Sequence, residues 1–365
     1  MKKLMHVMSH TAGALMALAL VLSPAYLCHA AEKTKLPKRI TLATFPIGSG
    51  NYAISNALAK VASEHSGIMV VTRPGSSASA WVGTTNAKGS PEMGLVHVLD
   101  AWWAFSGKVS PTPLPGDPYG TEPFYSPNPN LRMLIAGPSQ WVGLLTERSK
   151  PWKTIADAKG GVLAGGFSAH PGGYAGLVAL LATADLLEQR DFSLISVATS
   201  NASVKAYGEG RAELALGSAG NAAVSEANAT RPLRFLSAST TPEGVARAQA
   251  AFPGSRIAVF PDEAPGVEPG TTMLTYPMLV VASTHMSEDL AYHLTKTWWE
   301  HYRETWPIYS GCKGWTDKDF VIRNATIPYH EGAIRFFREV GAWSPEMDRI
   351  QAELLDGKYP FLNMN

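Results

Sequence analysis

The chain has 365 residues, of which 45% are hydrophobic, and its 31 basic and 30 acidic side chains give a net charge of +1. This near balance excludes a strongly basic surface of the kind that binds nucleic acid, and two cysteines exclude a disulfide framework. The length is sufficient for two domains with cores of their own.

The N-terminus is typical of a secretory signal. Lys2 and Lys3 precede an apolar stretch from Ala12 to Leu22, and Cys28-His29-Ala30 places small residues at a cleavage site. We therefore expect a signal peptide over 1–30, cleavage after Ala30 and a periplasmic mature protein. We do not expect the mature protein to span the membrane, because no run reaches the ~20 apolar residues of a spanning helix. A lipoprotein beginning at Cys28 is the weaker alternative, since Leu27 occupies a position that prefers a small residue. Export also counts against a soluble nicotinamide enzyme, whose cofactor pool lies inside the cell.

After the leader, strands and helices alternate. The apolar run 40–47 predicts a strand, the turn Gly48-Ser49-Gly50-Asn51 follows, and Ile54, Leu58 and Val61 predict a helix that stops at Gly67. Ser49 or Asn51 can cap this helix. The remaining elements expected before residue 137 are a strand at 68–72, a Gly/Ser turn at 74–79, a short helix to 87, a strand at 93–98, a helix from 99 and a strand at 131–136.

The same order returns in the second part of the chain. The expected elements are a strand from 162, the turn 168–173, a helix through 181, strands at 192–197, 214–217 and 233–236, and helices after the turns 200–201 and 218–221. The entry to the third strand recurs too, as "GSPEMGLV" at 89 and "GRAELALG" at 210. Alternating strands and helices predict parallel α/β sheets that bind ligands at the carboxyl ends of their strands.

Two extended apolar segments, 141–146 and 278–283, are expected to be hinge strands between the two parts. Later helical patterns begin at Ser287, Pro328 and Ser344 and are assigned to the first lobe. The predicted fold class is α/β, a two-lobe periplasmic binding protein (type II-like), each lobe a mixed, mostly parallel sheet flanked by helices. Lobe 1 comprises 31–140 and 272–365, and lobe 2 comprises 141–271. Residues 107–130, with seven prolines, predict a surface loop or a lid.

The first glycine turn has two readings. Gly48-x-Gly50-x-x-Ala53 matches a loose dinucleotide pattern, and Arg73, 25 residues after Gly48, stands where an NADP enzyme carries an arginine for the 2′-phosphate. A helix N-terminus also offers unpaired N–H groups and a partial positive charge to a smaller anion. Both readings need the same strand, turn and helix.

The C-terminal segment "IPYHEGAIRFFREVGAW" resembles the tail of the TAXI family, the extracytoplasmic solute receptors of tripartite ATP-independent periplasmic (TRAP) transporters. Pro328, His330, Gly332, Ala333, Phe337, Glu339 and Gly341 fit its pattern, as do "GSPEMGLVHVLDA" at 89–101, "YGEGRAELAL" at 207–216 and "SEDLAYHLTKTWWE" at 287–300. The resemblance spans essentially the whole mature chain. It implies a receptor that captures a small organic anion, such as a carboxylate or an amino-acid-like solute, and delivers it to TRAP permease subunits.

This sequence departs from the family at several presumed ligand contacts. The first turn lacks one of the family's two aromatic residues and keeps only Tyr52. His97 replaces a common Gln, and Asp100 stands one position after the family's acid. The second turn carries several serines and no Asn. The family's carboxylate ligands therefore transfer only as a class.

Catalytic and metal motifs are absent from the sequence: it has no Gly-x-Ser-x-Gly, His-Glu-x-x-His or Cys-x-x-Cys, and no cofactor is expected. Ser168 and His170 are more plausible as a cap or ligand contacts than as nucleophile and base, because side chains at i and i+2 rarely hydrogen-bond. For His97, ligand contact and a core position both remain open. The expected ligand-binding residues are Ser49, Gly50, Asn51, Tyr52, Arg73, Ser76, Ser77, Ser79, His97, Asp100, Ser168, His170, Gly172, Ser218 and Asn221.

Three rival functions remain at this point. One is a tricarboxylate-type transporter receptor, which shares two lobes and a Pro-Gly-rich second turn. Another is an exported α/β enzyme with a nucleotide at the Gly48-Gly50 turn. The last is a scaffold that binds other proteins through residues 107–130.

Overall fold

The computed structural model describes residues 35–108 and 123–363. The expected signal peptide, 1–30, lies outside the described residues, as does most of the Pro-rich segment 107–130. From Leu36 onward the chain forms one compact unit. Within the described residues, no helix combines the length and apolar character needed to cross a bilayer.

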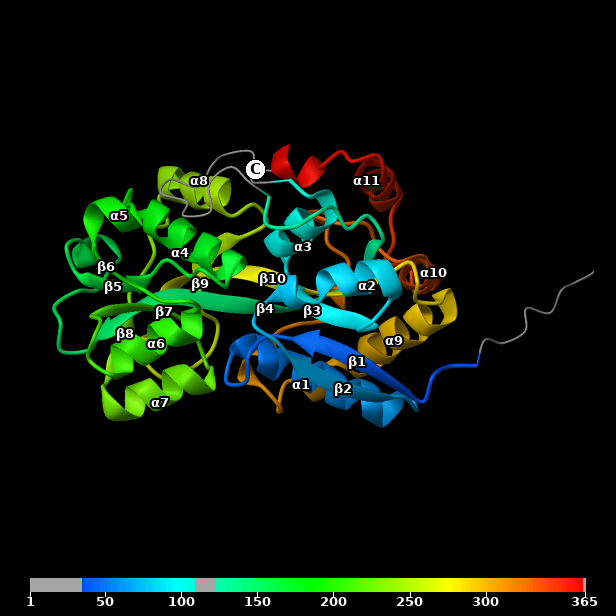
Figure 1. The fold of residues 1–365 in the computed structure, drawn as a ribbon, viewed down its shortest axis with the longest axis horizontal. Helices are drawn as coiled ribbons and strands as arrows, with labels where there is room; N and C mark the ends of the chain where they lie inside the picture. Colours follow the sequence, from blue (N-terminus) through cyan, green and yellow to red (C-terminus); the bar gives the residue numbers. More distant parts are fainter. Residues whose placement is uncertain (1–34, 109–122, 364–365) are drawn as a thin grey trace, which may run out of the picture. The chain divides into compact units, whose positions relative to one another are not determined.

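A ten-stranded sheet forms the centre of this unit, in the path order β2-β1-β3-β10-β4-β7-β5-β6, with β8 beside β4 and β9 beside β10 (Figure 1). The strands are β1 (Arg39–Thr44), β2 (Met69–Pro74), β3 (Met93–His97), β4 (Leu131–Glu147), β5 (Val162–Gly165), β6 (Ser193–Ser196), β7 (Leu214–Ser218), β8 (Leu233–Phe235), β9 (Arg256–Val259) and β10 (Thr272–Ser283).

Two parallel sets of strands flank a central antiparallel pair. β1 pairs in parallel with β2 and β3, and β5 pairs in parallel with β6 and β7. Between the sets run β4, of 17 residues, and β10, of 12 residues, which pair with each other. β10 also pairs with β3 of the first set, and β4 also pairs with β7 of the second. We call β1–β3 with their helices the first half and β5–β9 with theirs the second half. This arrangement confirms the predicted two-lobe α/β fold.

The connection between the halves differs from the prediction in detail. The strands expected at 131–136 and 141–146 are one continuous strand, β4, because Gly137 to Gln140 stay extended. The expected hinge segments 141–146 and 278–283 do not pair with each other. Instead, Val142 lies opposite Leu274, and Leu279 lies opposite Ala136. The antiparallel register thus places the two segments at opposite ends of the pair.

Helices cover both faces of the sheet (Figure 1). They are α1 (Gly50–His65), α2 (Val82–Lys88), α3 (Val98–Ser106), α4 (Pro171–Thr183), α5 (Glu188–Asp191), α6 (Ser200–Gly208), α7 (Ala222–Thr230), α8 (Pro242–Ala251), α9 (Glu288–His301), α10 (Glu331–Glu339) and α11 (Pro345–Leu355). Local sequence patterns did not predict α5, α8 or β9. α4 is apolar on every side and buried along nearly its whole length, because it packs against β4, β10 and α8.

The TAXI-like C-terminal pattern has a structural role in this fold. The His330 side chain accepts a hydrogen bond from the Gly332 N–H and so caps α10, and its Nε2 lies 3.1 Å from the Met286 carbonyl oxygen. A Cβ at Gly332 would stand 2.1 Å from the Glu288 carbonyl oxygen. Glycine at this position therefore lets α10 lie directly against α9.

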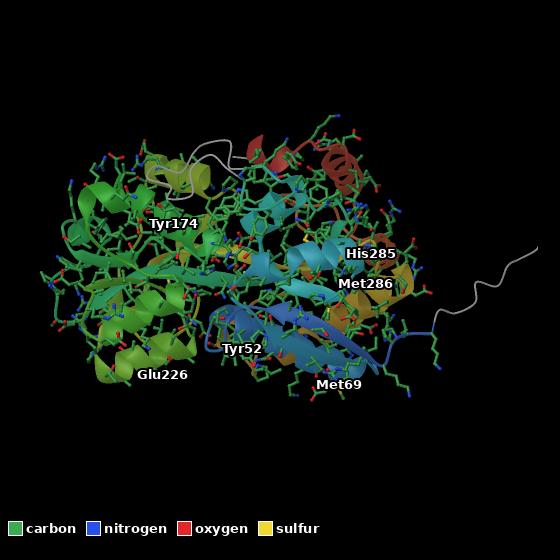
Figure 2. The ribbon with its side chains drawn as sticks, in the orientation of Figure 1. Tyr52, Met69, Tyr174, Glu226, His285 and Met286 are labelled. Carbon is green, nitrogen blue, oxygen red and sulfur yellow. The ribbon has the colours of Figure 1, made fainter. Side chains whose placement is uncertain are left out.

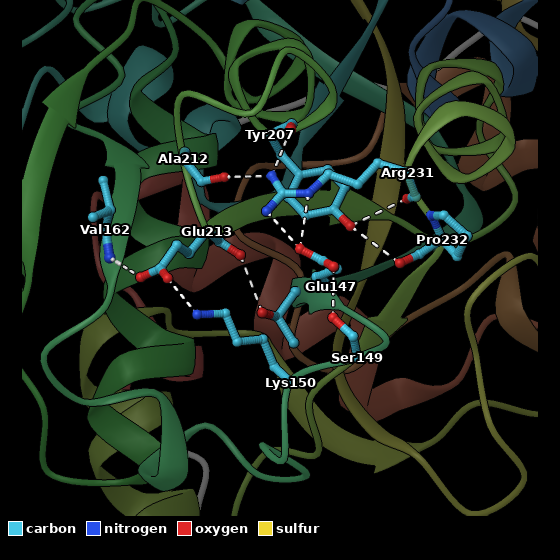
Figure 3. Close-up of polar contacts among 10 residues, drawn as sticks. Glu147, Ser149, Lys150, Val162, Tyr207, Ala212, Glu213, Arg231 and Pro232 are labelled. Carbon is cyan, nitrogen blue, oxygen red and sulfur yellow. Dashed lines mark hydrogen bonds and ion pairs between the residues drawn. The ribbon is translucent and has the colours of Figure 1, made fainter.

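The second half contains a tight ion-pair network centred on Arg231 (Figure 3). Its guanidinium donates hydrogen bonds to Glu147 Oε2 and to the carbonyl oxygens of Tyr207 and Ala212, at 2.8 to 3.1 Å. The same group lies 4.5 Å from the centroid of the Tyr207 ring. These contacts join β4 to α6 and to the chain that follows α7.

Candidate functional site

A narrow cavity lies where the two halves meet. Its walls come from Phe45, Pro46, Ser49, Gly50, Asn51, Ser76, His97, Gln140, Val142, His170, Gly173, Thr199, Ser200, Asn201, Leu216, Gly217, Ser218, Asn221 and Tyr276. The cavity holds about 510 Å³ of empty space including its mouth, but the centre of a water molecule can move through only about 30 Å³ of it. Since a single water needs roughly 10–15 Å³ by this measure, the cavity has room for only about two or three waters.

The cavity wall is built largely from the first residues of helices. Ser49 caps α1, Thr199 caps α6 and Asn221 caps α7, each by accepting a backbone N–H with its side-chain oxygen. His170 occupies the N-cap position of α4. Each helix start carries unpaired N–H groups and a partial positive charge. These starts come from both halves, so helix N-termini border the cavity on two sides.

A chain of buried polar side chains borders the cavity. Gln140 Nε2 donates to Asn51 Oδ1, and Asn51 Nδ2 lies 3.0 Å from His97 Nε2. With the amides oriented as these bonds require, His97 Nε2 is an acceptor and Nδ1 carries the proton. His97 Nδ1 is 3.5 Å from Asp100 Oδ2. The chain thereby links the central strand β4 to α1, β3 and α3.

Aromatic rings hold the two cavity histidines in place. Phe45 stacks on the His97 ring with centroids 4.9 Å apart and an interplanar angle of 15°. The edge of Tyr276 meets the same ring at 5.3 Å, and His170 is also 5.3 Å from it. Ser200 Oγ lies 3.3 Å from His170 Nδ1, whereas His170 Nε2 has no hydrogen-bond partner among the described residues.

Burial shifts the ionisation of the groups around the cavity. It lowers the pKa of His97 well below its usual value, with a further decrease from neighbouring His170, and it lowers the pKa of His170 to about 4. Burial also raises the pKa of Asp100 to about 7, although the Tyr125 hydroxyl and the Gly172 N–H act in the opposite direction. At neutral pH both imidazoles are therefore uncharged.

The lining residues include no lysine or arginine. A ligand anion would thus be met by N–H groups, hydroxyls, amides and neutral imidazoles. Such a wall favours a small ligand with oxygen acceptors and does not supply a fixed ion pair.

The structure gathers part of the expected site. Eight of the expected ligand-binding residues line the cavity: Ser49, Gly50, Asn51, Ser76, His97, His170, Ser218 and Asn221. Apart from His97, they belong to the expected turns 48–51, 74–79, 168–173 and 218–221, and they come from both halves. Their role in ligand binding stays a prediction.

The other expected residues lie outside the lining. Arg73 is exposed on β2, Tyr52 is half-buried one residue beyond Asn51, and Ser77 and Ser79 share a hydrogen bond of 2.7 Å with each other. Asp100 lies behind His97.

At the start of α4, two further expected residues fall outside the lining. Ser168 is exposed and does not cap α4, since His170 takes that position. A Cβ at Gly172 would stand 2.2 Å from His97 Nδ1, so this glycine allows α4 to approach the buried pair.

The sequence analysis missed several lining residues. Thr199, Ser200 and Asn201 form a hydroxyl- and amide-rich helix start like the others, and that similarity is a signal that could have identified them. Gln140 and Tyr276 lie in the central strands β4 and β10 and carry no local sequence signal. Their position follows only from the strand pairing.

Comparison with known proteins gives a family and a set of similar structures. No curated protein matches the chain in sequence. Among solved structures, it is similar to R. palustris Rpa4515 with adipate (15% identity, 88% of this chain and 98% of that chain, TM-score 0.48). It is also similar to the periplasmic aliphatic sulphonate binding protein SsuA from Escherichia coli (12% identity, 90% of this chain and 91% of that chain, TM-score 0.44). A third similar structure is a TctC solute binding protein from Polaromonas (12% identity, 89% of this chain and 96% of that chain, TM-score 0.42).

These structural similarities do not indicate which ligand this chain binds. The sequence profile of the NMT1-like family matches residues 117–341, more than half of the chain and from β4 to α10. The chain belongs to the NMT1-like family.

Proposed function

We propose that this protein is the extracytoplasmic solute-binding subunit of a TRAP transporter of the TAXI type. It is exported to the periplasm, captures a small organic anion between its two halves and delivers that anion to membrane permease subunits. The ligand is a carboxylate or an amino-acid-like solute. The TAXI-like motifs described above support the transporter type, and membership of the NMT1-like family is compatible with it.

The observation that carries the proposal is the convergence of helix starts on one cavity. Ser49 at α1, Ser200 at α6 and Asn221 at α7 all line it. Because unpaired N–H groups at a helix start favour negative charge, several such starts around one volume stabilise a bound anion. Because these helix starts belong to both halves, the affinity for the anion depends on how the two halves are placed relative to each other.

The small open volume supports a clamp that opens to admit its ligand. A cavity with only about 30 Å³ accessible to water centres does not take up an organic acid without widening. The sheet offers two continuous connections for such a movement, β4 and β10. Bending of these strands would separate Ser76 from Ser218 and expose the helix starts. A ligand that contacts both sides would then favour the closed form.

We propose binding and not catalysis for this site. Ser200 Oγ and His170 Nδ1 are 3.3 Å apart, the arrangement of a nucleophile and its base. However, burial lowers the pKa of His170 to about 4, so the imidazole is a weak proton acceptor at neutral pH. Hydrogen bonding to a ligand through His170 Nε2 requires no proton transfer.

The test is direct measurement of a ligand. The purified protein is unfolded to release any bound solute, the released solute is identified by mass spectrometry, and the refolded protein is titrated calorimetrically with a panel of carboxylates and amino acids. The proposal expects one-to-one binding of at least one small anion. Failure of every small anion to bind would reject it.

A further inference from the structure

A cluster of metal-ligating side chains lies where α1 and α9 end, outside the cavity described above. His65 is the last residue of α1, His301 is the last residue of α9, and Glu304 follows in the short helix Tyr302–Thr305. His65 is more than 230 residues from the other two in sequence, so no motif spacing marks the group. The sequence analysis accordingly expected no metal site.

The three side chains share one small volume. His65 Nε2 lies 2.7 Å from Glu304 Oε2, and His301 Nδ1 lies 3.0 Å from Glu304 Oε1. The two imidazole rings stack with centroids 3.6 Å apart and an interplanar angle of 4°. One nitrogen from each histidine and one carboxylate oxygen all lie within 4.8 Å of one another.

We propose that His65, His301 and Glu304 form a binding site for a divalent transition-metal ion of the Zn²⁺, Ni²⁺ or Cu²⁺ class. Two imidazoles and one carboxylate are a ligand set that suits these ions, whereas Mg²⁺ and Ca²⁺ prefer oxygen ligands throughout. Three protein ligands leave further coordination positions for water. The site is separate from the solute cavity and does not depend on the proposed function.

The required rearrangement is small. In a tetrahedral zinc site with bonds of about 2.0–2.1 Å, neighbouring ligand atoms are roughly 3.3 Å apart. The His–Glu separations of 2.7 and 3.0 Å are close to this value. The side chains of His65, His301 and Glu304 are 29%, 32% and 47% exposed, so rotation of the rings from stacked to converging orientations meets little resistance.

The electrostatics of the cluster also suit a cation. Hydrogen bonds from His65, which has the larger effect, and from His301 lower the pKa of Glu304, so its carboxylate is charged at neutral pH. A bound cation would replace the hydrogen bonds that the two histidines share with Glu304.

The backbone around the cluster is already fixed by other contacts. Trp298 Nε1 donates to the Leu58 carbonyl oxygen at 3.0 Å, and His293 Nε2 lies 2.8 Å from the Ser66 carbonyl oxygen. Both contacts join α9 to α1 or to the residue that follows it. Because the two helices are held before any ion binds, little ordering of the chain opposes binding. The ion would act as an additional link between the helix ends and raise the thermal stability of the protein.

The experiment is a calorimetric titration of tag-free protein with Zn²⁺ alone, together with melting curves with and without Zn²⁺. We expect one-to-one binding, a rise in melting temperature and no comparable effect of Mg²⁺. His301→Ala and Glu304→Gln should each weaken Zn²⁺ binding at least tenfold and abolish the rise. His285→Ala, at another exposed histidine, should leave both unchanged.

Two results would overturn the proposal. One is the absence of Zn²⁺ binding in the wild-type protein. The other is Zn²⁺ binding of unchanged affinity in His301→Ala and Glu304→Gln. Since all three side chains are partly exposed, these variants are expected to fold, and their melting curves without metal verify this. Carboxylate binding measured on the same samples is expected to stay unchanged, which separates this proposal from that of the solute site.

Discussion

Asp100 Oδ2 lies 3.5 Å from His97 Nδ1, and both side chains are buried beneath the start of α4. The pair lies directly behind the cavity, because His97 is itself a lining residue. A carboxyl group in this position affects both the stability of the fold and the charge seen by a ligand. We therefore expect both the stability of the protein and its affinity for an anion to depend on the ionisation of Asp100.

Replacement of Asp100 by Asn should stabilise the protein at alkaline pH. The folded protein holds the Asp100 proton up to about pH 7, whereas the unfolded chain loses it near the ordinary value of 3.8. Ionisation of Asp100 thus reduces the free energy of unfolding progressively between about pH 4 and pH 7, and the full reduction persists above pH 7. We expect the melting temperature of Asp100→Asn to exceed that of the wild type at pH 8 and to approach it at pH 4. An equal difference at both pH values would contradict this explanation.

Anion affinity should rise as the pH falls from 8 to 5. A bound anion beside His170 Nε2 raises the pKa of that imidazole from its unliganded value of about 4, so binding takes up a proton. Protonation of Asp100 below about pH 7 acts in the same direction because it removes a nearby negative charge. Calorimetry in buffers of different ionisation enthalpy measures this uptake. Affinity that is independent of pH, or that falls on acidification, would rule out the proposed role of the histidines.

His170→Ala should weaken anion binding about tenfold or more and reduce its pH dependence, since it removes one hydrogen bond and one titrating group. Ser168→Ala is the matched control, because Ser168 lies two residues away but is exposed and outside the cavity. The control should bind as the wild type does. Equal losses in the two variants would mean that the loop, and not the His170 side chain, determines affinity.

Two glycines of α4 should respond in opposite ways to alanine. At Gly172 a Cβ would stand 2.2 Å from His97 Nδ1 and 2.7 Å from Asp100 Oδ2, so Gly172→Ala should destabilise the protein by about 2 kcal/mol. At Gly176 the nearest atom is 3.8 Å away, so Gly176→Ala should be neutral or stabilise by up to about 1 kcal/mol. Urea unfolding of both variants provides the comparison. Similar effects at both positions would show that the approach of α4 to His97 is not tight.

The Arg231 network in Figure 3 should matter far more to stability than an exposed ion pair. Arg231→Ala removes the guanidinium that donates to Glu147 and to the carbonyl oxygens of Tyr207 and Ala212, and we expect a loss of about 1–3 kcal/mol. Arg211→Ala removes a pair with Glu209 whose side chains are 50% and 44% exposed, and should cost less than about 1 kcal/mol. Chemical denaturation measures both. A small loss at Arg231 would show that water replaces the guanidinium at these acceptors.

Local sequence patterns predicted most of the fold. The alternation of strand and helix patterns predicted the order of the elements. The cap residues Ser49 and Asn221 mark two of the helix starts that line the cavity. Each of these signals lies within a few residues of the element that it predicts. The prediction was wrong where a strand continues through Gly137 to Gln140, because glycine and proline usually interrupt strands. In β4 the pairing with β10 maintains the extended backbone, apart from a register shift near Pro277.

The sequence could not predict contacts between distant segments. Tyr125 beside Asp100, and Gln140 beside Asn51, come together only through the folded arrangement of several elements. The same holds for His65 with His301 and Glu304. Tyr52, labelled in Figure 2, is a similar case: its place in the first turn predicted a ligand contact, but it is not among the residues that line the cavity. A place in a turn therefore does not by itself decide whether a side chain lines the cavity.

The most direct test of the central claim is calorimetric titration of a small carboxylate into the wild-type protein, Ser76→Ala, Ser218→Ala and the double variant. Ser76 belongs to the first half and Ser218 to the second, and both line the cavity. The account predicts that each single change weakens binding severalfold, by about 1 kcal/mol for one hydrogen bond, and that the double change weakens it more. Binding that responds to only one half, or to neither, would contradict capture of the anion between the two halves.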